Sequence, residues 1–144
     1  MKKFMSMFVF SLCFSLSIFA QKGVKSEKPD ISKTVKAFAK AGDNQEVADL
    51  EKVLDSNYRI VMNQLFGSKE VSIMDRATYL EKIRTKEFGG QKREITITGI
   101  MTNGNTAVAK VIFKGSKMSV SSLIELVKTN TGIWLISSET PVML

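Results

Sequence analysis

Apolar residues recur at helical spacing in the first half of the chain. Ile31, Val35 and Phe38 lie three and four residues apart, which places them on one face of a helix. Asp30 can serve as the N-cap of this helix, and Gly42 can end it. The pattern therefore predicts an amphipathic helix packed against a core.

A second helix, two short strands and a third helix are expected next. Asp43 to Glu46 has the spacing of a capping box, and Leu50 lies on the apolar face of the helix that would follow. Tyr58 to Met62 and the neighbourhood of Val71 to Ile73 are typical of short strands. Asp75 can cap the third helix.

From residue 92 onward the apolar positions alternate with a period of two. Ile95 and Ile97 alternate with threonines, and the Asn-Gly pair at 103–104 is a strong hairpin signal. A two-residue turn would set the threonines against the apolar face of the next strand. A three-residue loop, Asn103 to Asn105, instead sets Ile97 opposite Val111. We favour the longer loop, because it keeps one face of the sheet apolar.

The same alternation predicts further strands up to the end of the chain. Two or three helices followed by an antiparallel meander indicate an α+β fold, with the helices packed on a curved, mainly antiparallel sheet. A short helical layer leaves part of the concave side unfilled. We therefore expect a cone-shaped domain with a blind pocket.

The first twenty residues have the layout of a secretory signal peptide. Two lysines precede an uncharged run at residues 4–20, and a polar stretch begins at Gln21. The run is shorter than the ~20 apolar residues of a spanning helix. We expect cleavage near Ala20 and a secreted or periplasmic protein that is not held at the membrane. An uncleaved anchor and, from Cys13, a lipoprotein are the alternatives.

Composition narrows the classes of function. The chain has 144 residues, a net charge of +7, one cysteine and no histidine. The lack of histidine excludes a Ser-His-Asp or Cys-His nucleophile and an imidazole-bound metal. We expect no cofactor and no metal, and the scattered basic residues do not favour nucleic-acid binding. The expected organisation is a signal peptide at 1–20, a flexible lead-in at 21–30 and one domain at 31–144.

The order of these motifs resembles the nuclear transport factor 2-like (NTF2-like) superfamily. Ala107 to Val111, Ile124 to Lys128 and Gly132 to Ile136 resemble its branch described as putative lumazine-binding, which is SnoaL-like. The resemblance implies a cone-shaped fold, which carries enzymes of the ketosteroid isomerase and polyketide cyclase type beside many binding proteins. Ser121-Ser122 departs from that branch, where an acidic residue and an aromatic residue often stand.

Candidate pocket residues are aromatic or methionine side chains near the apolar face. Flat aromatic rings stack on fused-ring ligands, and methionines provide an adaptable lining, although both also fill ordinary cores. The candidates are Tyr58, Met62, Tyr79, Met101, Met118 and Trp134.

Enzymes of this fold use an acid in the cone, and we assign no residue to that role. The acids considered are Asp55, Asp75 and Glu125. Asp55 follows a helix and is expected to be solvated, and helix capping accounts for Asp75. Alternation places Glu125 on the outer face of the sheet.

The sequence favours an exported, non-catalytic module that holds a small apolar or aromatic molecule. One alternative is an isomerase or cyclase that uses one carboxylate and a tyrosine, and an acid inside the pocket near Tyr58 or Tyr79 would favour it. Another is a ligand-free structural module, which a filled pocket would favour. The outer sheet face is apolar at Val108, Ile112 and Leu123, so we also expect a homodimer through that face.

Overall fold

The computed structural model describes residues 26–144, so the predicted signal peptide lies outside the described residues. Within them, no helix is long and apolar enough to cross a membrane. The helices are α1 (Lys28–Asp43), α2 (Val47–Val53) and α3 (Arg76–Arg84), with a short 3₁₀ helix, η1, at Leu65–Gly67. The strands are β1 (Leu54–Asn63), β2 (Val71–Asp75), β3 (Glu94–Asn103), β4 (Thr106–Lys114), β5 (Ser119–Lys128) and β6 (Trp134–Met143).

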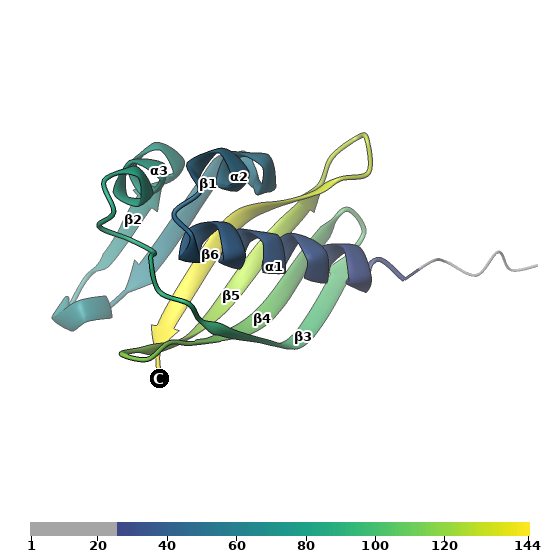
Figure 1. Cartoon of the computed structure of the whole chain (residues 1–144). Helices are drawn as coiled ribbons and strands as arrows, with labels where there is room; N and C mark the ends of the chain where they lie inside the picture. Colours follow the sequence, from purple (N-terminus) through teal and green to yellow (C-terminus); the bar gives the residue numbers. More distant parts are fainter. Residues whose placement is uncertain (1–25) are drawn as a thin grey trace, which may run out of the picture.

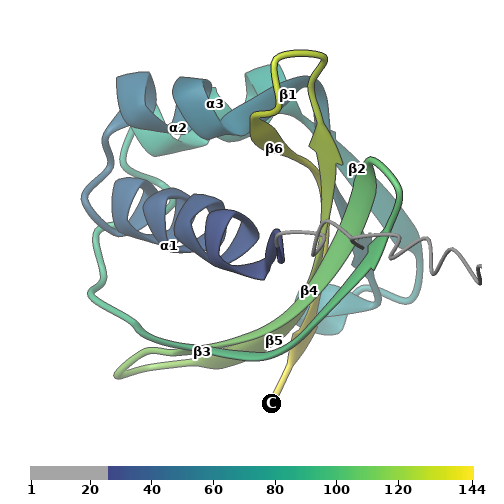
Figure 2. The same cartoon turned by 90° about the vertical axis from the view of Figure 1, so that its right-hand side faces the viewer.

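The predicted α+β architecture is confirmed. Three helices pack on one six-stranded sheet with the order β2-β1-β6-β5-β4-β3. All neighbouring strands are antiparallel except β1 and β6, which run parallel. The sheet curves around α1, and α2 and α3 lie across the same concave side (Figures 1 and 2). No helix among the described residues covers the convex face (Figure 2).

The core fills the space between the helices and the concave face of the sheet. The inward side of α1 and the alternate residues of β4 and β5 are buried, as their spacing predicts. Burial of such side chains contributes ~1.5–3 kcal/mol each. The buried residues of this layer include Ile31, Val35, Phe38, Val111, Phe113 and Ile124.

Two predicted helix caps are wrong, and one is confirmed. The first helix begins at Lys28 with Pro29 in its first turn, so Asp30 is not the cap and the expected lead-in is helical from residue 28. The proposed capping box at 43–46 does not form, because α1 continues through Asp43 and Glu46 is the N-cap of α2, without a side-chain bond. Asp75 does cap α3 and accepts a hydrogen bond of 2.8 Å from the Thr78 amide.

The β3–β4 hairpin has the predicted apolar register but not the predicted loop. Ile97 pairs with Val111, whereas Asn103 pairs with Thr106 across a two-residue turn. The register changes because Thr98 is an extra residue that forms a β-bulge. The bulge lies within the strand instead of in the loop.

A second bulge lies in the last strand. Leu126 of β5 pairs with Ile136, but Glu125 pairs with Ser138, which leaves Ser137 as the extra residue. Beyond the bulge, the alternation of β6 is reversed, and Glu139 pairs with the fully buried Ile124 on the concave side. One inserted residue therefore turns a carboxyl group toward the interior.

Candidate functional site

A cavity of about 390 Å³ lies between the C-terminal half of α1, α3 and the concave face of the sheet. Its walls are mainly apolar and come from all of these elements. The apolar lining includes Phe38, Ile60, Met62, Ile83, Phe113 and Val120. Phe66 of η1 and Met118 lie at the rim, where they are 74% and 41% exposed. A cavity of this kind is typical of small-molecule sites.

A second hollow of about 480 Å³ lies between β1 and the start of α3. It is wide open, and most of its lining residues are polar, among them the exposed Asn57, Arg59 and Asp75. Although it is larger, it lacks the apolar walls that hold a small molecule. We therefore take the cavity beneath α1 as the candidate site.

Two acids line this cavity, and Glu139 is the one that is partly buried, whereas Glu87 is exposed. The Ser122 hydroxyl donates to its Oε1 at 2.7 Å, and the Tyr58 hydroxyl donates to its Oε2 at 3.3 Å. Ser122 and Tyr58 are almost fully buried. Glu139 is half-buried because one side faces the cavity, while the rest of the carboxyl is enclosed by protein. A single carboxyl group is thus held in a fixed orientation by two neutral donors.

The surroundings of Glu139 raise its pKa. Burial is the main cause, since it removes water from the charged form. The hydrogen bond from Ser122, the positive charge of Arg93 and the hydrogen bond from Tyr58 act in the opposite direction. Burial also raises the pKa of Tyr58 and Tyr79, and the nearby Glu139 adds to both shifts, so both phenols stay protonated at neutral pH.

Tyr79 brings a hydroxyl group to the cavity wall. The ring packs against Tyr58 at a centroid distance of 5.4 Å and against Phe88 at 6.4 Å. Its hydroxyl has no hydrogen-bond partner among the described residues, although the side chain lines the cavity. Because a buried phenol normally finds a partner, this hydroxyl can bond to a molecule in the cavity.

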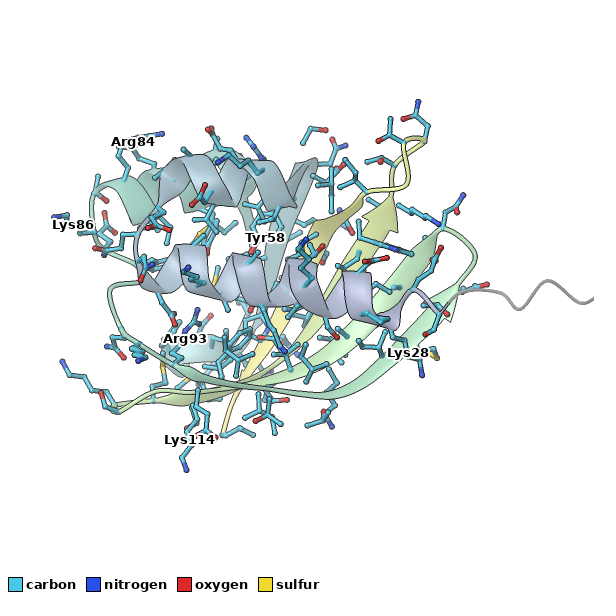
Figure 3. The ribbon with its side chains drawn as sticks, turned by 45° about the vertical axis from the view of Figure 1, so that its right-hand side comes forward. Lys28, Tyr58, Arg84, Lys86, Arg93 and Lys114 are labelled. Carbon is cyan, nitrogen blue, oxygen red and sulfur yellow. The ribbon has the colours of Figure 1, made fainter. Side chains whose placement is uncertain are left out.

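Arg93 is fixed at the edge of the cavity by Asp43. The Asp43 carboxylate accepts the Arg93 Nε–H at 2.6 Å and the backbone amide of the same residue at 3.0 Å. The guanidinium carbon lies 4.6 Å from the centroid of the Phe113 ring. Figure 3 shows Arg93 and Tyr58 inside the outline of the domain, whereas Arg84 and Lys86 project outward.

Three of the predicted pocket residues line the cavity, and a fourth supports it. Met62, Tyr79 and Met118 belong to the lining. Tyr58 lies beside it, with its hydroxyl on Glu139. The site therefore draws the predicted side chains from β1, α3 and the β4–β5 turn together.

Two predicted pocket residues, Met101 and Trp134, lie outside this cavity. Met101 is 70% exposed and pairs with Val108 of the convex face, because the Thr98 bulge reverses the alternation of β3. Trp134 is buried at the opposite end of β6, where its carbonyl accepts from Thr34. Neither contributes to the cavity lining.

Sequence reasoning gave no role to Glu139 or Arg93, and it noted Ser122 only as a departure from the family pattern. The acids that it considered lie outside the lining, and Glu125 is exposed on the convex face as expected. One signal was present, because Glu139 is the single charged residue between Trp134 and Met143. Among residues 26–144, no group of three or more acidic or cysteine side chains could hold a metal ion.

The comparisons with known proteins agree with this fold. Residues 26–140 match the model of a family described as putative lumazine-binding. None of the curated proteins matches the chain. An NTF2-like protein from Cytophaga hutchinsonii superposes with a TM-score of 0.71 at 15% identity, over 83% of this chain and 99% of that one.

Two further solved structures have the same architecture. An NTF2-like protein of unknown function from Silicibacter pomeroyi gives a TM-score of 0.70 at 14% identity, over 82% of this chain and 96% of that one. A ketosteroid isomerase-like protein from Erwinia carotovora atroseptica gives 0.65 at 12% identity, over 83% and 98%. At these identities, the likeness concerns the fold.

Proposed function

Since the chain belongs to the putative lumazine-binding family of NTF2-like proteins, we propose that it is an exported binding module without catalytic activity. It holds one small apolar or aromatic molecule in the cavity beneath α1. The apolar walls take up the body of the molecule, and Glu139 with the Tyr79 hydroxyl bonds to its polar group.

One observation carries this proposal: an open, apolar-walled cavity of about 390 Å³ contains an oriented carboxyl group. A ligand-free structural module has no need of such a space, because filling it would add packing energy. The description of the family agrees with a flat heteroaromatic ligand.

Native mass spectrometry of protein purified from its source tests binding and export together. The expected result is a complex with one small molecule on a chain that begins at Gln21. An intact mass that includes residues 1–20 would contradict cleavage near Ala20. Retention of the same molecule by a variant whose cavity is filled, Val120→Trp, would contradict the assigned site. The exposed Leu123→Trp variant is the matched control, because it adds the same ring on the convex face.

A proton-transfer enzyme is the second candidate, and the position of Glu139 favours it. The carboxyl lies inside the cavity and is bonded to Tyr58, the arrangement that a carboxylate-and-tyrosine mechanism requires. Burial raises the pKa of Glu139 toward the range of a general acid or base. The retained molecule, incubated in D₂O with the protein, separates the candidates by NMR. Loss of a C–H signal with the wild type but not with Glu139→Gln would indicate catalysis, and unchanged spectra agree with binding alone.

We also propose a homodimer through the convex face of the sheet. Leu123 and Val142 are 48% and 58% exposed there, and Val108 and Ile112 are only partly covered. An apolar surface of this kind is typical of an interface. Static light scattering at micromolar concentration should give twice the monomer mass. Leu123→Lys should return the monomer, and a monomeric wild type would refute the proposal.

A further inference from the structure

Not every charged residue of the cavity lining is paired with a residue of opposite charge. Glu87 is paired with Lys82 at 2.6 Å, and Arg93 is paired with Asp43 at 2.6 Å. Glu139, the third charged group of the lining, has no cation within salt-bridge distance and receives only two hydroxyl donors. The cavity therefore contains one carboxyl group that forms no ion pair with a cation of the described chain, although the charge of Arg93 lies near enough to lower its pKa.

The Glu139 carboxylate can accept further hydrogen bonds. A carboxylate offers about four lone-pair positions, and the hydroxyls of Ser122 and Tyr58 occupy two of them. A buried carboxylate without a cation is costly, and that cost is recovered when a positively charged donor comes within contact distance. A neutral ligand would leave the Glu139 carboxylate without a paired cation.

The cavity is less suited to an anionic ligand than to a cationic one. Arg93 is its only basic lining residue among residues 26–144, and its Nε–H and backbone amide are already bonded to Asp43. A ligand carboxylate would add negative charge beside Glu139 and Glu87. Like charges at such short range oppose binding.

We infer that the ligand carries a positively charged nitrogen, such as a protonated amine or amidine, which contacts Glu139 while its apolar or aromatic body lies against Phe113 and Val120. This inference rests on the proposed binding function, and it names the chemical class of the ligand. The Tyr79 hydroxyl accepts or donates a further hydrogen bond at the same end of the molecule.

Three probes with the same aromatic body test the inference. These are 2-naphthylmethylamine, which is a cation at neutral pH, the neutral 2-naphthylmethanol and the anionic 2-naphthoate. Each is titrated by calorimetry into the full mature protein. Because a charge-assisted hydrogen bond is stronger than a neutral one, the amine should bind about tenfold more tightly than the alcohol, and the carboxylate should bind most weakly.

Variants locate the preference at Glu139. In Glu139→Gln, which keeps the shape and removes the charge, the amine and the alcohol should bind within about threefold of each other. Glu125→Gln is the matched control, since it removes a carboxyl from the adjacent strand on the exposed convex face. It should leave the tenfold preference unchanged.

The outcomes separate the inference from the function on which it rests. Equal affinities for the three probes, or tightest binding of 2-naphthoate, would overturn the inference and leave a binding pocket. Absence of binding by all three would overturn both. A preference for the amine that survives in Glu139→Gln would place the cation elsewhere and also refute the inference.

The pH dependence of wild-type binding provides a test that needs no variant. The titratable and charged groups that interact with Glu139 are Tyr58 from β1, Tyr79 from α3 and Arg93 before β3, and Asp43 from α1 interacts with Tyr79 and Arg93. The phenols stay protonated across the acidic and neutral range. Affinity for the amine should therefore rise with pH as Glu139 ionises, and affinity for the alcohol should not rise. Parallel profiles for the two probes would contradict the inference.

Discussion

The contact between Arg93 and Asp43 should stabilise the fold far more than an ordinary surface ion pair. Asp43 at the end of α1 is 10% exposed and accepts two hydrogen bonds from Arg93, whose side chain is 30% exposed. The guanidinium also lies over Phe113. The contact joins the first helix to the start of β3, fifty residues later. We expect Arg93→Met to keep the packing of the stem and the backbone amide bond to Asp43, and to remove the guanidinium bond to Asp43 and its contact with Phe113.

The size of the effect follows from the contacts that are lost. A hydrogen bond to a charged group contributes ~1.5–3 kcal/mol, and a cation–π contact ~0.5–1 kcal/mol at an exposed site. Partial exposure of Arg93 reduces both contributions through solvent screening. We therefore expect a loss of about 2 kcal/mol in the free energy of unfolding, which lowers the urea midpoint by about 1 M.

Urea unfolding followed by the fluorescence of Trp134 measures this loss. Trp134 is the single tryptophan and lies outside the cavity lining, so the substitution does not change its surroundings. Arg84→Met is the control, because Arg84 pairs with Glu81 while both side chains are 57% exposed. Such a pair contributes less than ~1 kcal/mol. An Arg93→Met variant as stable as Arg84→Met would refute the reasoning.

Three substitutions test other parts of the structure. Burial raises the pKa of Glu139 above its ordinary 4.5, so folding favours the protonated form, and the wild type loses stability as pH rises from about 4.5 through the folded pKa. In urea titrations, Glu139→Gln should therefore gain stability relative to wild type over that pH interval. A stability difference that stays constant with pH would contradict the burial argument. Gly89→Ala would place a Cβ 2.1 Å from the Gly42 carbonyl oxygen at a φ of +76°. It should therefore lower the melting temperature more than Gly67→Ala, which has φ +82° and open space; equal losses would show that backbone strain alone matters. Asp75→Ala should lower the melting temperature through the missing N-cap, Asp75→Asn should keep most of the wild-type value, and equal thermal stability of the two variants would refute the capping role.

The order and type of the elements could be predicted because they follow from local periodicity. The spacing of apolar residues predicts which side of an element is buried, as on the helix face of Ile31 and Val35 and in the alternation of Ala107 to Phe113. Asp75 was identified as a cap for the same reason, since its bond reaches only three residues along the chain.

The site could be predicted only in part because two bulges change the phase of the alternation. An extra residue such as Thr98 or Ser137 has no distinctive side chain, yet it exchanges the two faces of all that follows in its strand. Met101 was therefore expected inside, and Glu139 was overlooked. The bond between Asp43 and Arg93 spans fifty residues, a separation at which local pattern carries no information.

The parallel pairing of β1 with β6 sets the order in which the domain can form. β1 begins at Leu54 and pairs with β6 around Ile136 and Ser138, so this pairing unites the two halves of the chain (Figure 1). During synthesis, β1 has no neighbour on the side away from β2 until β6 has left the ribosome. Closing the long loop between β1 and β6 is slow, because the chain must lose conformational entropy before the strand contacts form. The nascent domain therefore stays open until β6 has been synthesised, a delay that leaves time for a chaperone or a translocation machine to engage it.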